Sequence, residues 1–385
     1  MPALLKRGHE LAVLYEYPSP DGRPTVDPPR AVPVSFWDDL EPKAALNRIR
    51  AFQPDVVYSH SSHSLDLEKA LLDHYPTLLY SHVFVGTCAT GRKCHTFPHA
   101  QPCTREFGPM CLALHYPRRC GGLNPLRAWR GFHDQSVRNS RLKDYRAILV
   151  ASSHMYEEYK RHGISADKLD LLALPITDTN LETLPYTPRV ATGSILFLGR
   201  LTDLKGVDYL VRAIPAAANL LGRPLRLTVA GDGQELPRLE ALARRLGIAV
   251  DFTGWIESER KREVIQQADL LAVPSLWPEP FGLVGIEAQC FGLPAVGYAV
   301  GGIPDWLLQG RTGELAPGDP PTVEGLANAI VRALADSRHY SELCRGAWEM
   351  SRRFTLERHV AKLEPALQTA CAGTPALAVG KDQVQ

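Results

Sequence analysis

The chain has 385 residues and a nearly balanced charge, with 43 Lys and Arg against 42 Asp and Glu. This length allows two domains of roughly 150–200 residues, each with its own core, and the absence of a long basic run argues against nucleic-acid binding. No apolar run reaches the roughly 18 residues of a membrane-spanning helix and no signal peptide opens the chain, so we expect a cytoplasmic protein.

Short apolar runs alternate with amphipathic segments in the N-terminal half, which is typical of a doubly wound parallel sheet. We predict strands over 9–15, 55–59, 78–82, 147–151 and 169–174. Helices are predicted over 42–52, 65–74, 125–143 and 153–162. The polar, proline-rich stretch 177–192 is predicted to link two domains, the first of which spans 1–186.

The same alternation continues after this linker and predicts a second Rossmann-like domain over 187–371. Strands are predicted over 195–198, 225–230, 250–252, 270–274 and 294–298, and closing helices over 323–335, 337–353 and 356–370. Residues 372–385 show no periodicity and are expected to form a disordered tail. The predicted fold class is α/β with two parallel sheets.

Two carboxylates flank the predicted start of a helix near residue 282. Glu279 lies between two prolines, in a loop, and Glu287 follows after seven intervening residues, inside the helix. The free N–H groups at a helix start favour an anion, so this spacing suits a nucleotide diphosphate sugar. Two surface glutamates beside a buried helix are the alternative interpretation.

Two basic residues occupy an earlier strand-to-helix loop, since Arg200 and Lys205 follow the predicted strand 195–198. Such loops lie at the ligand-binding edge of a parallel sheet, where these cations could neutralise a diphosphate. A solvated basic loop is the alternative. Gly231 and Gly233, in the next such loop, permit close backbone approach to a base or sugar, although this Gly-Asp-Gly signal is weak alone.

In this order the motifs resemble those of the family 4 retaining glycosyltransferases of GT-B fold. The matching patterns are G-R-x4-K-G, G-D-G, P-E-x-F-G-x4-E and V-G-G-I-P-D, which begin at Gly199, Gly231, Pro278 and Val300. The resemblance covers nearly all of the C-terminal half. It implies two Rossmann-like domains that face a cleft.

The resemblance also implies site residues. Arg200 and Lys205, with Gly199, look like the residues that hold the donor diphosphate. Glu279 resembles the glutamate that binds the donor sugar, and Glu287 resembles the ribose-binding glutamate. Backbone amides of the same loop would face the donor, at Phe281, Gly282 and Leu283.

The implied reaction moves a hexose from a nucleotide sugar, UDP- or GDP-linked, to a hydroxyl with retention of anomeric configuration. The family needs no divalent cation, and no Asp-x-Asp motif occurs here, so Arg200 and Lys205 would take the role of the metal. The acceptor could be a polysaccharide, a lipid-linked sugar or a small molecule. A catalytically silent sugar-nucleotide-binding protein and a GT-B nucleotide-sugar epimerase are the alternatives.

The beginning of the chain departs from the family pattern. Residues 4–17 resemble the end of the first helix and the second strand, so the first strand and its glycine-rich loop are expected to be missing. A missing central strand would expose unpaired backbone on its neighbours and puts the activity of this chain in doubt.

A cysteine-rich insertion, 83–124, follows the predicted strand 78–82. Its cysteines could be free thiols, metal ligands or disulfides; without a C-x-x-C pair, zinc is only weakly indicated, with Cys88, Cys103, Cys111 and Cys120 as candidate ligands. We predict that this insertion covers the acceptor side of the cleft. His82, at the preceding strand end, is a candidate active-site residue by resemblance, or a structural histidine. Basic and aromatic residues of 116–119 and of the helix with Arg127, Trp129 and Arg130 could touch a membrane peripherally, although solvated charges are the favoured interpretation.

Overall fold

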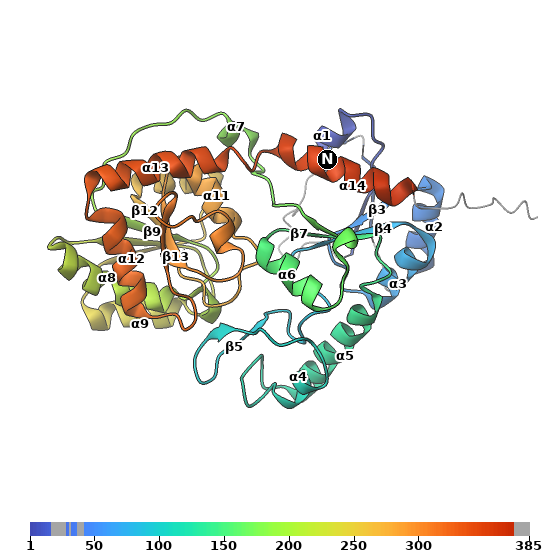
Figure 1. The fold of residues 1–385 in the computed structure, drawn as a ribbon, viewed down its shortest axis with the longest axis horizontal. Coiled ribbons are helices and arrows are strands. Elements are labelled where there is room, and N and C mark those ends of the chain that lie inside the picture. Colours follow the sequence, from blue (N-terminus) through green and yellow to red (C-terminus); the bar gives the residue numbers. More distant parts are fainter. Residues whose placement is uncertain (17–27, 31, 37–41, 373–385) are drawn as a thin grey trace, which may run out of the picture.

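The computed structural model describes residues 1–16, 28–30, 32–36 and 42–372. Two α/β domains lie side by side, with the N-terminal domain in blue and green and most of the C-terminal domain in yellow to red (Figure 1). Except for Ala372, the predicted tail 372–385 lies outside the described residues. Among the described helices, none is both long and apolar enough to cross a membrane.

The N-terminal domain is built on a four-stranded parallel sheet of order β3-β4-β7-β8. These strands are β3 (Val57–Ser59), β4 (Thr77–Ser81), β7 (Ala147–Val150) and β8 (Leu169–Leu171). All residues of β4 are buried, as expected for a parallel strand covered on both faces. The helices are α2 (Pro42–Phe52), α3 (Leu65–His74), α5 (Pro125–Arg141) and α6 (Ser153–Arg161), followed by the 3₁₀ turn η1 (Ala166–Lys168).

A separate pair of parallel strands lies before this sheet. β1 (Val13–Tyr15) pairs with β2 (Val34–Phe36), after the short helix α1 (Pro2–Leu5), and β3 pairs only with β4 among the described strands. Glu16 holds the end of β1 beside the loop after β3, because it accepts hydrogen bonds from Ser62 Oγ at 3.2 Å and from the His63 amide at 2.6 Å. The expectation of an incomplete first sheet stays a prediction.

The C-terminal domain contains a six-stranded parallel sheet of order β11-β10-β9-β12-β13-β14. The chain runs outward from β9 through β10 to β11 and then returns to the other side of β9, so the order reverses between β9 and β12. The strands are β9 (Ser194–Leu198), β10 (Arg226–Ala230), β11 (Val250–Gly254), β12 (Leu270–Val273), β13 (Ala295–Tyr298) and β14 (Gly313–Ala316). Ligands of open α/β sheets bind at such a reversal, outside the carboxyl ends of the strands.

Helices cover this sheet on both faces. They are α8 (Val207–Leu221), α9 (Leu236–Leu246), α10 (Ser258–Gln267), α11 (Leu283–Gln289), α12 (Val323–Leu334) and α13 (Ser337–Ser351). Two 3₁₀ turns, η2 (Asp203–Lys205) and η3 (Ile303–Asp305), lie in loops at the carboxyl ends of the strands.

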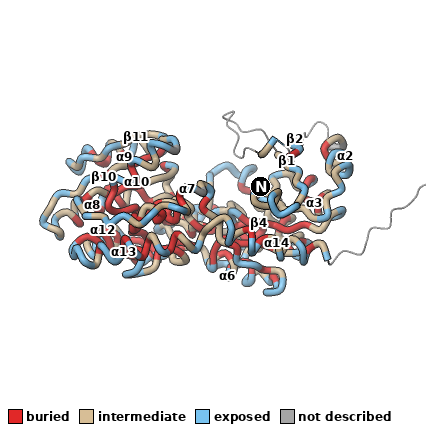
Figure 2. The backbone as a smooth tube through the Cα atoms, turned by 90° about the horizontal axis from the view of Figure 1, so that it is seen from above, coloured by how far each residue is buried: buried red, intermediate tan, exposed pale blue. Residues whose placement is uncertain are grey.

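Several contacts join the domains. The linker contains α7 (Thr179–Glu182), and the last helix, α14 (Leu356–Ala372), returns to pack against α1 and β4. His359 of α14 lies 2.9 Å from the Ala173 carbonyl oxygen, and the Ser153 amide donates a 2.6 Å hydrogen bond to Asp305 across the domains. Figure 2 shows buried residues running through both domains, with exposed residues at the outside.

The cysteine-rich insertion is held by a buried ion pair. It contains a small antiparallel pair, β5 (Cys94–His95) and β6 (Gln101–Pro102), and the helix α4 (Met110–Ala113). Lys93 Nζ pairs with Glu158 of α6, where both side chains are at most 2% exposed, and also donates to the carbonyl oxygens of Thr87 and Arg105. The buried Lys93 side chain therefore fixes the insertion to α6 and joins two parts of the insertion to each other.

Candidate active site

The carboxyl ends of β9 and β12 bring together two residues that the sequence motifs singled out. Lys205, in the loop after β9, lies 2.7 Å from Glu279, in the loop after β12. Ser275 Oγ and Trp277 Nε1 also donate to the same oxygen, Glu279 Oε2, at 3.0 and 2.9 Å. Oε1 accepts no hydrogen bond from any described residue, so this oxygen is available to a ligand.

Trp277 connects this pair to the N-terminal domain. The Lys205 ammonium lies 5.7 Å from the centroid of the Trp277 ring, a cation–π distance. Trp277 also packs against an N-terminal cluster that includes Phe84, two residues after His82. The Glu279 loop therefore faces the strand ends of the N-terminal sheet.

Arg200 lies in the same loop as Lys205 but is not engaged. Its side chain is exposed and makes no hydrogen bond or ion pair with the residues that the structure describes. A guanidinium in this state is free to bind a phosphate in a bidentate manner.

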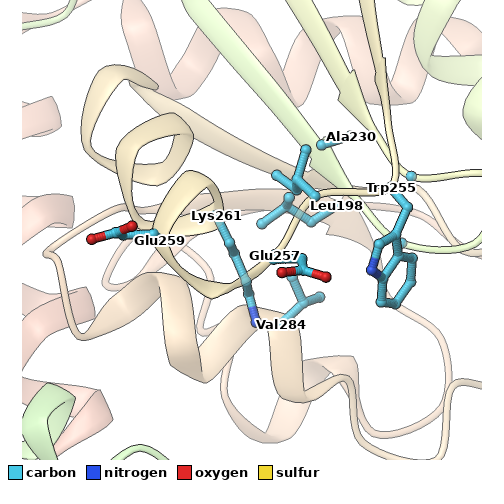
Figure 3. Close-up of a pocket in the computed structure, with 10 residues that line it drawn as sticks. Leu198, Ala230, Trp255, Glu257, Glu259, Lys261 and Val284 are labelled. Carbon is cyan, nitrogen blue, oxygen red and sulfur yellow. The ribbon is translucent and has the colours of Figure 1, made fainter. Parts of the chain in front are cut away.

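Glu287, inside α11, forms an ion pair with Lys261 of α10. Lys261 lines a pocket of about 590 Å³ at the ends of β9 and β10. The pocket is lined by Leu198, Gly199, Ala230, Gly231, Trp255, Ile256, Glu257, Glu259, Lys261 and Val284. In Figure 3, Lys261 reaches from α10 toward Val284 on α11, with Glu257 between Lys261 and Trp255. The sequence analysis did not identify Lys261, Trp255 or Glu257.

Gly231 and Gly233 allow two loops of the protein to pack closely against each other. A Cβ atom on Gly231 would lie 1.9 Å from the Gly199 carbonyl oxygen, and one on Gly233 would lie 2.3 Å from that of Leu201. Both glycines also have positive φ angles, of 149° and 154°. These residues are therefore needed to bring the loops after β9 and β10 together, whatever ligand binds beside them.

The segment from Phe281 to Leu283 is positioned by Trp306. Trp306 Nε1 donates a 2.7 Å hydrogen bond to the Phe281 carbonyl oxygen, and the Trp306 ring fills the space where Gly285 has no side chain. Gly282 caps α11 with φ of 93°. The amides of Gly282, Leu283 and Val284 donate to no acceptor among the described residues, as expected at a helix start.

His82 meets a second histidine. His82 follows β4 and His60 follows β3, and His82 Nε2 lies 2.9 Å from His60 Nδ1. Desolvation by the surrounding protein lowers the pKa of His60 to about 4, with smaller effects from His82 and His359, and desolvation also lowers the pKa of His82. Both imidazoles are therefore neutral at neutral pH, so that one nitrogen donates and the other accepts. The sequence analysis missed His60.

Three of the candidate zinc ligands, Cys88, Cys111 and Cys120, each contact a different residue of the insertion. Cys88 Sγ lies 3.5 Å from Thr90 Oγ1, while the Cys111 and Cys120 thiols donate to the Glu106 and Leu114 carbonyl oxygens. All eight cysteines, Cys103 included, are free. Among the described residues, no group of three or more His, Cys, Asp or Glu side chains is arranged to hold a metal ion.

These features agree with comparisons with known proteins. Residues 190–349 match the family model described as glycosyl transferases group 1. This segment contains the candidate donor-binding residues from Gly199 to Glu287, but it does not reach His82 or the insertion.

Curated relatives are similar over part of the chain. An uncharacterized glycosyltransferase from Methanocaldococcus jannaschii is 35% identical over 37% of this chain and 36% of its own length. D-inositol 3-phosphate glycosyltransferases from Stackebrandtia nassauensis and Xylanimonas cellulosilytica are 38% and 36% identical over 41% and 47% of this chain. The similarity spans 38% and 43% of those two relatives, so less than half of their length is represented.

Solved structures extend the comparison to both domains. Sucrose-phosphate synthase from Thermosynechococcus elongatus has a TM-score of 0.66 at 21% identity and covers 97% of this chain and 92% of that one. Anabaena Alr3699/HepE in complex with UDP-glucose has a TM-score of 0.63 at 20% identity, covering 88% of this chain and 86% of that one. The fold is therefore GT-B, as the sequence predicts.

Proposed function

We propose that the protein is a retaining glycosyltransferase that moves a hexose from a UDP- or GDP-sugar to an acceptor hydroxyl without a metal ion. The observation that carries this proposal is the Lys205–Glu279 pair at the sheet reversal, with the exposed Arg200 in the same loop as Lys205. The group 1 match over the same residues and the UDP-glucose named for HepE support a nucleotide-sugar donor.

The chemistry assigned to these residues is mainly electrostatic. The bond between the anomeric carbon and the diphosphate breaks while the acceptor oxygen bonds to the same face of that carbon, and the hydroxyl proton passes to the departing phosphate. Arg200 and Lys205 would stabilise the additional negative charge that the diphosphate gains as this bond breaks. No side-chain nucleophile is required, unlike in a retaining glycosidase.

The remaining residues divide the donor between them in this proposal. Glu279 Oε1 would accept a hydrogen bond from a hydroxyl of the donor sugar, since Oε2 is already held by three donors. Glu287 would bind the ribose hydroxyls next to the 590 Å³ pocket, in which the base would lie against Trp255. His82 would face the sugar from the N-terminal domain.

The test is a panel of UDP- and GDP-hexoses incubated with the protein, with release of the free nucleotide measured with and without polysaccharide, lipid-linked and small-molecule acceptors. A transferase should release nucleotide faster with an acceptor and form a product with the donor's anomeric configuration. An epimerase would release a free epimer without an acceptor. A silent binding protein would bind the nucleotide sugar and release nothing, and either result would overturn the proposal.

A further inference from the structure

The cysteine-rich insertion and the start of α5 expose an unusual number of large apolar side chains. Fourteen large hydrophobic residues are exposed in the described part of the chain, and eight of them lie between Val83 and Trp129. Leu123, Leu126 and Trp129 are 81%, 69% and 56% exposed. Isolated exposed apolar residues need no explanation, but such a concentration in one segment indicates an interaction surface.

The most exposed of these residues lie on α5 and in the loop just before it, because α5 begins at Pro125. Leu126 and Trp129 are three residues apart and therefore lie on one side of α5, whereas Ala128 is buried; Leu123 precedes the N-cap residue Asn124. Met110 and Leu112 on α4, which packs against α5, are 53% and 39% exposed, so both neighbouring helices carry exposed apolar side chains. Figure 1 shows α4 and α5 together at the outer edge of the molecule, away from the linker and α14.

The same segment carries a strong excess of positive charge, although the whole chain is nearly neutral. Between residues 83 and 133 the only acidic residue is Glu106. The basic residues of this segment are Arg92, Lys93, Arg105, Arg118, Arg119, Arg127 and Arg130. Lys93 is paired with Glu158, but the guanidinium groups of Arg92, Arg127 and Arg130 form no ion pair with any described residue. The excess charge therefore faces solvent.

A recess lies between the insertion and α5. It has a volume of about 440 Å³, and its lining includes Arg92, Arg127 and Leu123. Its walls are closely packed, because a Cβ atom on Gly131 of α5 would lie 2.9 Å from the Ala89 carbonyl oxygen. The recess thus offers the guanidinium groups of Arg92 and Arg127 next to Leu123, the most exposed leucine among the described residues.

We propose that the α4–α5 surface, defined by Met110, Leu112, Leu123, Leu126, Trp129 and the arginines 92, 127 and 130, docks on an anionic phospholipid bilayer. The apolar side chains would enter the boundary between headgroups and acyl chains, where Trp is favoured, and the arginines would contact lipid phosphates. An amphipathic surface fits a bilayer better than a soluble polyanion, because a polyanion uses the charge and leaves the leucines in water. The docking does not depend on the proposed transfer reaction.

The experiment is co-sedimentation with vesicles of phosphatidylcholine, with and without phosphatidylglycerol. The wild-type protein should bind the anionic vesicles, and added salt should weaken this binding. For the variant R127Q/R130Q, the partition coefficient onto anionic vesicles should fall roughly 30-fold, because each arginine near such a surface contributes about 1 kcal/mol. L126S/W129S should lose at least as much, and brominated lipid should quench tryptophan fluorescence of the wild type more than that of Trp129→Phe.

Matched controls use exposed residues elsewhere. V190S/L220S removes apolar side chains that are 84% and 60% exposed, and R244Q/R245Q removes charges on α9; both should bind like the wild type. Glu279→Ala should also bind vesicles, so failure of the proposed transferase would not affect this result. The proposal is overturned if anionic vesicles do not bind the protein, or if L126S/W129S binds unchanged while dextran sulfate competes, which would indicate a polyanion site.

Discussion

Lys205 Nζ lies 2.7 Å from Glu279 Oε2, although 74 residues separate them in the chain. The two loops meet because the strand order reverses between β9 and β12, so that the loops after these two strands border one crevice. The two charges neutralise each other, and Lys205, Ser275 and Trp277 together hold Glu279 Oε2. This arrangement would leave one glutamate oxygen for the sugar and, with Arg200, two cations for the diphosphate.

The first prediction concerns the two cations. Arg200→Ala and Lys205→Ala should each reduce turnover by roughly 10²–10³, comparable to the loss of one transition-state hydrogen-bond donor. Thermal unfolding should change little for Arg200→Ala, because its side chain is exposed and unpaired. Arg245→Ala, an exposed arginine at the end of α9, is the matched control. Activity should persist in EDTA; if a chelator abolished transfer without unfolding the protein, a metal rather than these residues would carry the charge.

The second prediction separates the two glutamates by calorimetry with UDP and with UDP-hexose, or with the GDP forms. Glu287→Ala should weaken the binding of both ligands by about 1.5–3 kcal/mol, which is the contribution of a hydrogen bond to a charged group. Glu279→Ala should leave the binding of the nucleotide diphosphate unchanged and should weaken the binding of the intact sugar donor. Lys261→Ala adds a control, since it frees Glu287 from its ion pair without removing the carboxylate. Equal losses for both ligands in both glutamate variants would show that the assigned roles are wrong.

The third prediction follows from the neutral His60–His82 pair. His60 is surrounded by Tyr58, Tyr80, His82 and His359, and its pKa is lowered from the usual 6.5 to about 4. The unfolded chain therefore binds more protons than the folded protein between these values, so that stability should fall as the pH falls from 7 toward 4. In His60→Asn this loss should be smaller, as measured by the melting temperature at several pH values.

A histidine that is merely exposed provides the control for that experiment. His99→Asn, in the insertion, should retain the wild-type dependence of the melting temperature on pH. If His82 also acts on the donor sugar, His60→Asn should lower kcat and shift the acid limb of the pH–rate profile, because His82 would lose the partner that fixes its tautomer. An unchanged rate profile would leave the pair with a structural role only.

The sequence predicted local structure well where local signals are strong. The helices 42–52 and 65–74 occur with the predicted bounds, and Ser64 caps the second through a hydrogen bond from the Leu67 amide. The strand β14, with the sequence GELA, was not predicted, because a short segment with a charged residue has no clear periodicity. The strands β9 and β12 were predicted because each is an apolar run that is followed by a glycine or a proline. The same pattern marks where each strand ends, and so it also placed the candidate site in the loops at these carboxyl ends.

Partners that meet only in the folded protein were not predictable. Lys261 is one charged residue in a polar helix, and nothing in its spacing indicates a pair with Glu287, 26 residues later. His60 follows a strand of only three residues, and its role becomes visible only when the fold places it beside His82 at the end of the neighbouring strand. Lys93 similarly looks like a solvated loop lysine, although the fold buries it almost completely.

The last prediction concerns how the cysteine-rich insertion is held. Lys93→Met removes one partner of the buried pair and leaves the Glu158 carboxylate without its closest cation, which should destabilise the protein by roughly 3–5 kcal/mol. Arg161 and His162 also contact Glu158, so the loss should lie toward the lower end of that range. The measurement is denaturant unfolding, with Lys69→Met as the control, because Lys69 pairs with Asp73 at an exposed site on α3.

The same protein preparation tests whether a metal shares this role. We expect all eight thiols to react under denaturing conditions without a reductant, in agreement with eight free cysteines. Metal analysis of protein purified without added metal should then find less than one zinc or iron per chain. One equivalent of zinc, together with a small effect of Lys93→Met, would instead assign the order of the insertion to Cys88, Cys103, Cys111 and Cys120. Such a site would require the four sulfur atoms to approach one point to about 2.3 Å.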